Sequence, residues 1–148
     1  MAAPQPAEQY DISDDRNRVD LDVVWDFLSS KAYWNRWRKR GDVEAQVAGA
    51  WRVVGGYAAG GTMVGFARAL SDGVALAYLA DVFVLPEHRG RGLGRRIVRT
   101  MIEDGPGAEF RWLAHTRDAQ VMYAGFGFRP GDRTLLERPG SNPAIEPY

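Results

Sequence analysis

Arginine and glycine alternate in one short segment that joins an apolar run to an amphipathic run. The segment is Val84-Leu85-Pro86-Glu87-His88-Arg89-Gly90-Arg91-Gly92-Leu93-Gly94-Arg95-Arg96. Free N–H groups and the positive dipole end attract anions to the start of a helix. Arginine there is locally unfavourable, and a bound polyanion removes the conflict. The glycines allow a tight turn and a close approach of the backbone to a ligand. We therefore predict a phosphate-binding loop.

A solvated basic helix face is the alternative interpretation of the same arginines. Lys31 and Lys39 are the only lysines among the 19 basic residues, so arginine is the usual cation of this chain. Some of the cluster is therefore expected from composition alone. The glycine spacing between a strand and an amphipathic helix favours the phosphate-binding loop.

Composition narrows the function classes. The 148 residues suit one domain, and 19 acidic residues balance 19 basic ones, which argues against a general nucleic-acid or membrane-surface binder. The absence of cysteine excludes disulfides and a cysteine nucleophile, and with only His88 and His115 no metal site is expected. Residues 1–9 lack signal-peptide features and no apolar run approaches about 20 residues, so a cytoplasmic protein is expected.

Hydrophobic periodicity predicts an α/β domain over residues 10–138, between an unstructured segment 1–9 and a loose tail 139–148. The expected elements are strand 10–13, helix 21–30 capped by Asp20, helix 42–48 capped by Asp42, strands 51–58, 63–70 and 75–85, helix 93–103, strand 110–114, helix 118–124 and a last strand from Phe128 to about Leu136. The nearly continuous apolar run 75–85 predicts burial on both faces.

Two further features allow a structural or a functional interpretation. Asp81 interrupts the apolar run, either as a carboxylate hydrogen-bonded near the strand end or as a polar group directed into a cleft. Aromatic and basic residues alternate over 31–40, either as a helix end packed on the core or as an aromatic-walled substrate pocket. The predicted substrate contacts in the second case are Tyr33, Trp34 and Trp37.

Two motifs, together with the order of elements, resemble the GNAT superfamily of acyl-CoA-dependent N-acetyltransferases, in particular a bacterial branch of it. Arg89-Gly90-Arg91-Gly92-Leu93-Gly94 matches the family's Gln/Arg-x-x-Gly-x-Gly/Ala loop, and Tyr123 to Phe128 matches its Tyr-x-x-x-Gly-Phe. The resemblance spans roughly residues 10–136. It implies a mixed, largely antiparallel central sheet with helices on both faces, splayed around a cofactor cleft.

The resemblance also implies acetyl-CoA as co-substrate and a set of contacts to it. The loop amides would hold the pyrophosphate, and backbone groups of a splayed strand would pair with the pantetheine amides and stabilise an oxyanion. Thr116 stands where many members have Asn, and it would donate a hydrogen bond to the cofactor. The implied cofactor contacts are Val82, Phe83, Val84, Arg89, Gly90, Arg91, Gly92, Leu93, Gly94, Arg95 and Thr116.

The resemblance implies a proton donor, whereas the proton acceptor does not carry over from the family and is chosen from the residues. Tyr123 would protonate the departing thiolate, since a tyrosine with pKa about 10 can donate to a thiolate whose conjugate acid has a pKa of roughly 8.5. A buried core tyrosine is the structural alternative. The amine must lose a proton, and Asp81 is the first candidate acceptor, ahead of Glu87 and His88, with a chain of waters as the other route.

The sequence is compatible with three functions. The first is acetyl transfer to a primary amine of a small molecule or peptide, and the second is a non-catalytic coenzyme A-binding module of the same fold. The third is a nucleic-acid binder that uses the arginines of 89–99 with Trp34 and Trp37 as stacking platforms. The sequence does not decide between an apolar or cationic acceptor, favoured by the aromatics, and an anionic one, favoured by Arg36, Arg38, Lys39 and Arg40. A homodimer is one expectation of the resemblance.

Overall fold

The computed structural model describes residues 9–142 and 145. Its strands are β1 (Asp11–Ser13), β2 (Arg52–Tyr57), β3 (Met63–Ser71), β4 (Leu76–Val84) and β5 (Arg111–Ala114). Its helices are α1 (Leu21–Ser30), α2 (Arg40–Gly49), α3 (Leu93–Ile102) and α4 (Gln120–Ala124), with short 3-10 turns at Arg16–Arg18 and Pro86–His88. The strands form one sheet in the order β1-β2-β3-β4-β5, in which only β4 and β5 are parallel.

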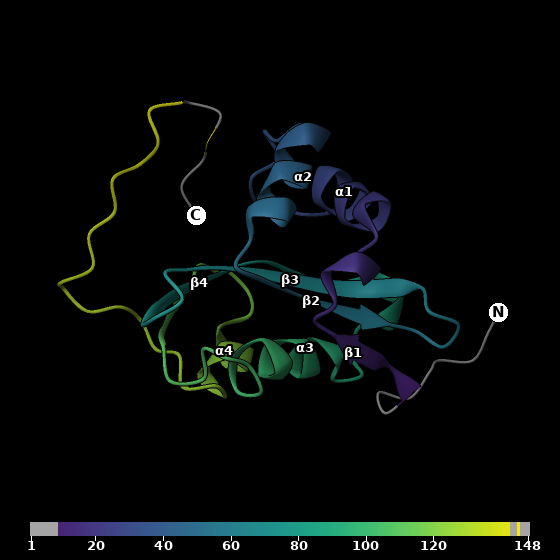
Figure 1. Cartoon of the computed structure of the whole chain (residues 1–148). Coiled ribbons are helices and arrows are strands. Elements are labelled where there is room, and N and C mark those ends of the chain that lie inside the picture. The colour runs from purple at the N-terminus through teal and green to yellow at the C-terminus, as the bar shows by residue number, and fades with distance from the viewer. Residues whose placement is uncertain (1–8, 143–144, 146–148) are drawn as a thin grey trace.

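Helices cover both faces of the sheet, with α1 and α2 on one side and α3 and α4 on the other (Figure 1). The buried side chains form two clusters that correspond to these layers. One cluster joins α3 to the sheet through Leu93, Ile97 and Met101, as the periodicity of the helix predicts. The predicted mixed, largely antiparallel sheet with helices on both faces is confirmed.

The helix α1 begins where its cap predicts. The Asp20 carboxylate accepts hydrogen bonds from the backbone N–H groups of Asp22 and Val23, which lie in the first turn and lack partners within the helix. Val24, Phe27 and Leu28 are then buried against the sheet. The packing of α1 on the sheet fixes the position of Phe27, which lines the cavity of the site.

The predicted second helix needs a correction at its start. It begins at Arg40, with Lys39 as the N-cap, rather than after Asp42. Asp42 is the third residue of the helix, and its carboxylate accepts from the Lys39 N–H at 2.7 Å. An acidic residue satisfies a helix start from this position as well as from the cap itself, and the sequence pattern does not separate the two.

Two strand predictions were wrong. Within the described residues no strand follows β5, so the predicted strand from Phe128 to Leu136 is absent. Pro130 and Gly131 interrupt that segment, and Leu136 is exposed. The burial of β4 alternates along the strand instead of extending over both faces. Its apolar run lines an open cavity on one side, and such a surface can be as hydrophobic as a core.

The predicted ends of the domain fall partly outside the described residues. Residues 1–8 belong to the predicted unstructured segment 1–9, and residues 143–144 and 146–148 belong to the predicted tail 139–148. The boundaries of the domain stay predictions. None of the helices in the described part of the chain is long and apolar enough to span a membrane.

Two glycines let α3 pack closely on the sheet. A Cβ at Gly65 in β3 would lie 2.6 Å from Ile97 Cδ1, and one at Gly56 in β2 would lie 3.1 Å from the same atom. Protein interiors have little free volume, so a contact as short as the first forces the neighbour to move.

We predict that Gly65→Ala lowers the free energy of unfolding by about 1–3 kcal/mol through this clash. Urea unfolding measures the change. Ile97→Val removes the Cδ1 atom that the new methyl meets, so the double variant should lose less than the sum of the two single losses. Gly41→Ala is the matched control, because a Cβ there meets nothing within 4 Å. Strict additivity of Gly65→Ala and Ile97→Val would contradict the packing assigned to α3.

Candidate active site

The strands β4 and β5 diverge halfway along β4. Their paired residues run from Leu76 opposite Arg111 to Leu79 opposite Ala114, where β5 ends. β4 continues to Val84 along β3 alone. The second half of β4 therefore has a backbone edge without a neighbouring strand, and this is the splay that the resemblance implies.

A bulge at Asp81 accompanies the divergence. Phe66 pairs with Phe83 and Arg68 with Ala80, so Asp81 and Val82 together stand opposite one residue of β3. Asp81 adopts a positive φ of 53°, which Asp tolerates better than most residues with a side chain. The extra residue changes which face the following side chains occupy. Leu79 packs in the α3 cluster, whereas Phe83 packs in the α1 cluster.

The free edge presents backbone groups from alternate residues. The N–H of Leu85 donates to Val64 of β3 at 2.8 Å, and hydrogen-bonding direction alternates along an antiparallel strand. The backbone groups of Val84 and Val82 therefore point away from β3, into the splay. The backbone of Phe83 points toward β3, and its ring stacks on Phe27 with centroids 4.1 Å apart. Of the three predicted strand contacts, two present their backbone to the cleft.

The start of α3 lies at the end of this edge. Its N-cap, Gly92, has a left-handed backbone with φ 78° and no side chain to cap the helix, and Gly90 has the same φ. No acidic residue stands in the first turn. A Cβ on Gly94 would point between Val84 Cγ2 at 3.7 Å and Met122 Sδ at 3.8 Å. The open N–H groups and the space kept by glycine fit a diphosphate and a narrow chain attached to it.

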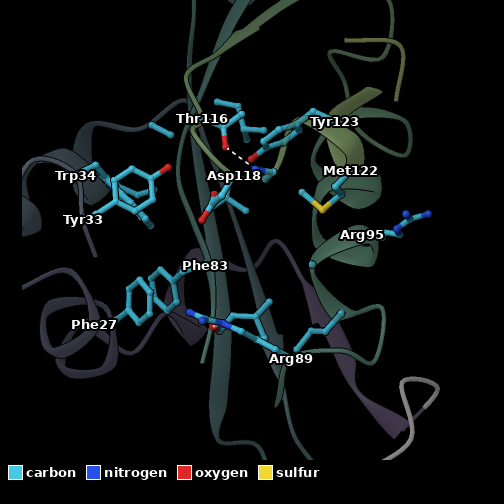
Figure 2. Close-up of a pocket in the computed structure, with 18 of the residues that line it drawn as sticks. Phe27, Tyr33, Trp34, Phe83, Arg89, Arg95, Thr116, Asp118, Met122 and Tyr123 are labelled. Atoms are coloured by element: carbon cyan, nitrogen blue, oxygen red, sulfur yellow. Dashed lines mark hydrogen bonds between the residues drawn. The ribbon is translucent and has the colours of Figure 1, made fainter. Parts of the chain in front are cut away.

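The arginines of the loop do not all reach this site. Arg91 donates to the Tyr10 hydroxyl at 2.9 Å, and that hydroxyl lies 2.7 Å from His88 Nδ1, so Arg91 fastens the loop to the β1 region. Arg89 Nε donates to the Val84 carbonyl at 2.9 Å, and Arg95 points away from the strands (Figure 2). The Leu93 side chain is buried in the core. The cofactor contacts predicted for Arg91 and Leu93 therefore depend on their main chain, because their side chains are engaged elsewhere.

A cavity of about 550 Å³ occupies the splay. Its two sides come from different layers of the fold (Figure 2). Aromatic side chains from α1 and the segment after it, together with Phe83, form one side, and Met122 and Tyr123 of α4 form the other. Thr116 also lines it, and its Oγ1 accepts from the Ala119 N–H at 3.0 Å, which orders the start of α4.

Tyr123 is buried at the α4 side of the cavity. Burial raises the pKa of Tyr123 to about 12, with smaller contributions from Tyr33 and Asp118. The hydroxyl therefore keeps its proton throughout the physiological pH range. Its ring packs on Phe128 with centroids 5.3 Å apart, so both ends of the Tyr-x-x-x-Gly-Phe motif meet.

Asp81 lies on the aromatic side of the cavity, and two arginines and an indole hold its carboxylate. Arg38 donates to both carboxylate oxygens, at 2.7 and 3.0 Å. Arg68 Nε donates at 2.7 Å, and Trp34 Nε1 donates at 2.7 Å. Both interpretations of Asp81 therefore apply, because the carboxylate is hydrogen-bonded in the strand and also lines a cleft.

These partners determine the acidity of Asp81. Burial alone would raise the pKa of Asp81, but the hydrogen bond from Arg38 and the charge of Arg68 outweigh it and hold the pKa below its usual value. A carboxylate with a lowered pKa and four donors is a weak proton acceptor. Its geometry suits the positioning of its neighbours.

The predicted aromatic contacts separate into two places. Tyr33 and Trp34 line the cavity of the splay, whereas Trp37 lines a second cavity. The Tyr33 hydroxyl accepts from the Arg117 N–H at 3.1 Å. Sequence reasoning did not single out Arg68, although a lone charge inside the apolar run 63–70 was a usable signal. It also missed Phe27 and Met122, which periodicity assigns to a core. Among the described residues, no group of three or more potential ligands could hold a metal ion.

Comparisons with known proteins agree with this geometry. A model of the acetyltransferase (GNAT) domain family matches residues 51–130. A solved structure from Xanthomonas campestris pv. campestris, provisionally assigned as a GNAT acetyltransferase, is 31% identical, with 93% of this chain and 97% of that chain covered and a TM-score of 0.83. A provisional acetyltransferase from Deinococcus radiodurans is 18% identical, with coverage of 93% and 94% and a TM-score of 0.72, and shows the fold alone.

A curated relative shares part of the chain. The Gibberella zeae protein FG08082, provisionally named an acetyltransferase, is 35% identical over 85 residues. The match covers 57% of this chain and 46% of the fungal protein, so this chain matches less than half of that relative's length.

We predict that Asp81→Asn destabilises the fold by about 3–5 kcal/mol, because it leaves two buried guanidinium groups without their carboxylate. Chemical denaturation at neutral pH measures the loss. In the wild type the lowered pKa of Asp81 stabilises the fold at pH values above its unfolded pKa of about 4. This contribution is lost as the pH falls from that value through the folded pKa.

The matched control is Asp22→Asn, which removes the carboxylate of an exposed pair with Arg40. Exposed pairs contribute about 0–1 kcal/mol, so this variant should unfold close to the wild type. Equal losses for the two variants would contradict the structural role assigned to Asp81.

Proposed function

The chain belongs to the GNAT acetyltransferase family, and we propose that it transfers an acetyl group from acetyl-CoA to a primary amine of a small molecule or peptide. The observation that carries this proposal is the continuity of the free β4 edge with the uncapped glycine start of α3. The free edge of β4 offers main-chain partners for amides, and the start of α3 offers N–H groups for phosphates. Tyr123 lines the same cavity.

Acetyl-CoA supplies the reactive acetyl thioester when it is bound. The N–H groups at the start of α3 would hold its diphosphate, and the backbone of Val82 and Val84 would pair with the amides of its arm. The Val84 carbonyl already accepts from Arg89 Nε, so Arg89 has to release it before that carbonyl can pair elsewhere. Gly94 keeps the passage between β4 and Met122 open.

Tyr123 is the proposed proton donor to the sulfur of the leaving group. Because burial raises its pKa to about 12, the hydroxyl is neutral near pH 7 and can donate a hydrogen bond there. A raised pKa also makes complete proton transfer less favourable, so stabilisation of the developing negative charge is the larger part of its role.

The amine proton requires a different group. Asp81 is bound by its donors and has a lowered pKa, which makes it a positioning residue in this proposal rather than the base. His88 lines the cavity, but its Nδ1 is engaged by Tyr10. We propose that the amine passes its proton to solvent, the route that the sequence left open beside Asp81.

We predict that Tyr123→Phe lowers kcat about 100-fold or more without weakening coenzyme A binding, because the change removes a donor that acts only in the transition state. Thiol release from acetyl-CoA with amino acids, polyamines, aminoglycosides and peptide N-termini measures turnover. Calorimetry with coenzyme A measures binding.

Tyr57→Phe is the control, since the Tyr57 hydroxyl is buried without a hydrogen-bond partner in the described structure and lies outside the cavity. This variant should keep wild-type turnover. Equal turnover of Tyr123→Phe and wild type would remove Tyr123 from its role. Coenzyme binding without turnover of any acceptor would favour a non-catalytic coenzyme A-binding module.

A further inference from the structure

A second cavity of about 500 Å³ adjoins the one in the splay. Tyr78, Ala80 and His115 line both cavities, so the two lie next to each other along β4. Arg68, Trp37 and Leu70 line only the second. A molecule could therefore place one end in each cavity.

Arg68 is a charged residue in the lining of this second cavity. Its side chain is 8% exposed, and its Nε donates to Asp81. The hydrogen bond that ties Arg68 to Asp81 comes from Nε, and its Nη1 and Nη2 atoms are not among the fully buried polar atoms that lack a partner in the described structure. Arg38 differs, because it donates from Nε, Nη1 and Nη2 to Asn35, Gln46 and Asp81.

The charges around Asp81 do not balance. One buried carboxylate faces two buried guanidinium groups, Arg38 and Arg68, which leaves an excess positive charge in the protein interior. One carboxylate compensates two guanidinium charges only in part, so an anion beside Arg68 would be favourable. Glu137 also lines the second cavity, but it is exposed on the C-terminal segment and forms no ion pair with Arg68.

We propose that the acceptor amine carries an oxyanion, which Arg68 binds in the second cavity while the amine lies in the first. This inference rests on the proposed function of the first cavity. With Nε fixed on Asp81, the two Nη atoms of Arg68 form a planar fork that matches the oxygens of a carboxylate or phosphate. Asp81 is then a positioning residue for this fork.

Trp37 adds a second polar group and an apolar wall. Its indole N–H is buried without a hydrogen-bond partner in the described structure, and its ring lines the same cavity as Leu70. Buried polar groups are normally paired, so this donor too suits an oxygen-bearing ligand. The acceptor class is therefore an amine joined to an oxyanion by a body that tolerates apolar walls. The sequence left apolar and anionic acceptors as alternatives, whereas the proposed site binds an acceptor that has both an apolar body and an anionic group.

The first test compares three amines with the same phenyl body, with and without a carboxylate, and one amine that carries a phosphate on a different body. Thiol release is measured with phenylalanine, phenylalaninamide and phenethylamine, and with 2-aminoethyl phosphate as the phosphate arm. The charge-assisted pair should raise kcat/KM of phenylalanine about 10- to 100-fold over its amide. Equal values for all amines would overturn the inference but leave the acetyl transfer intact. A preference for the phosphate arm alone would identify phosphate as the oxyanion.

A binding measurement separates this inference from the proposed function. Calorimetry of the coenzyme-free protein with 3-phenylpropanoate and 3-phenylpropanamide tests the anion site without any acetyl transfer. The carboxylate should bind about 10- to 100-fold more tightly than the amide. Equal affinity or no binding of the carboxylate would contradict the site. Carboxylate binding without turnover of any amine would refute the proposed transferase function instead.

The variant Arg68→Lys keeps a positive charge but removes the planar fork. The ratio of carboxylate to amide affinity should fall toward one in this variant. Arg52→Lys is the matched control, a largely buried arginine that pairs with Asp14 and lines neither cavity, and it should keep the wild-type ratio. An unchanged ratio in Arg68→Lys would contradict the assignment. If Arg68→Lys does not fold, the wild-type comparison of carboxylate and amide decides the inference.

Discussion

The divergence of β4 from β5 creates the free strand edge and the cavity on which the proposed function depends. Up to Leu79 the two parallel strands share hydrogen bonds, and beyond it β4 keeps only β3 as a neighbour. Buried backbone groups need partners, so an edge that opens into a cavity is costly unless a ligand or solvent reaches it. The start of α3 poses the same requirement at the end of that edge, because Gly92 cannot cap the helix. Both unmet requirements face one cavity, and both suit a long ligand with amides and phosphates.

The bulge at Asp81 is the second consequence of this divergence. It turns one carboxylate toward the α1 side of the sheet, where Trp34, Arg38 and Arg68 meet it. A buried charge cluster is a poor source of stability by itself, and its value lies in the order that it imposes. Here Asp81 holds Trp34 of the first cavity and Arg68 of the second cavity in fixed positions. The acetyl-transfer side and the proposed anion side are thereby linked through one residue.

Much of this architecture was open to prediction from local chemistry. The cap at Asp20, the α3 periodicity and the glycine turn before α3 depend on residues close together in sequence and were predicted correctly, whereas the splay followed from the family resemblance. The pairing of Asp81 with Arg38 and Arg68 depends on contacts 43 and 13 residues apart, which a single sequence does not specify. Trp34 and Trp37 were assigned to one substrate pocket because they are close in sequence, but they line different cavities, which the fold and not the local sequence decides. The last strand was predicted from residues near Leu135, but Pro130 and Gly131 precede them, and Leu135 and Leu136 are exposed in the described structure.

The central claim is that the free edge of β4 and the first turn of α3 hold coenzyme A through their main-chain N–H groups. Amide hydrogen exchange, followed residue by residue with and without coenzyme A, tests this most directly. The account predicts slower exchange at Val82, Val84 and residues 90–95 when the coenzyme is present, because bound amides open less often. The β1–β2 pair should be unaffected. Unchanged exchange at the start of α3 in saturating coenzyme would contradict it.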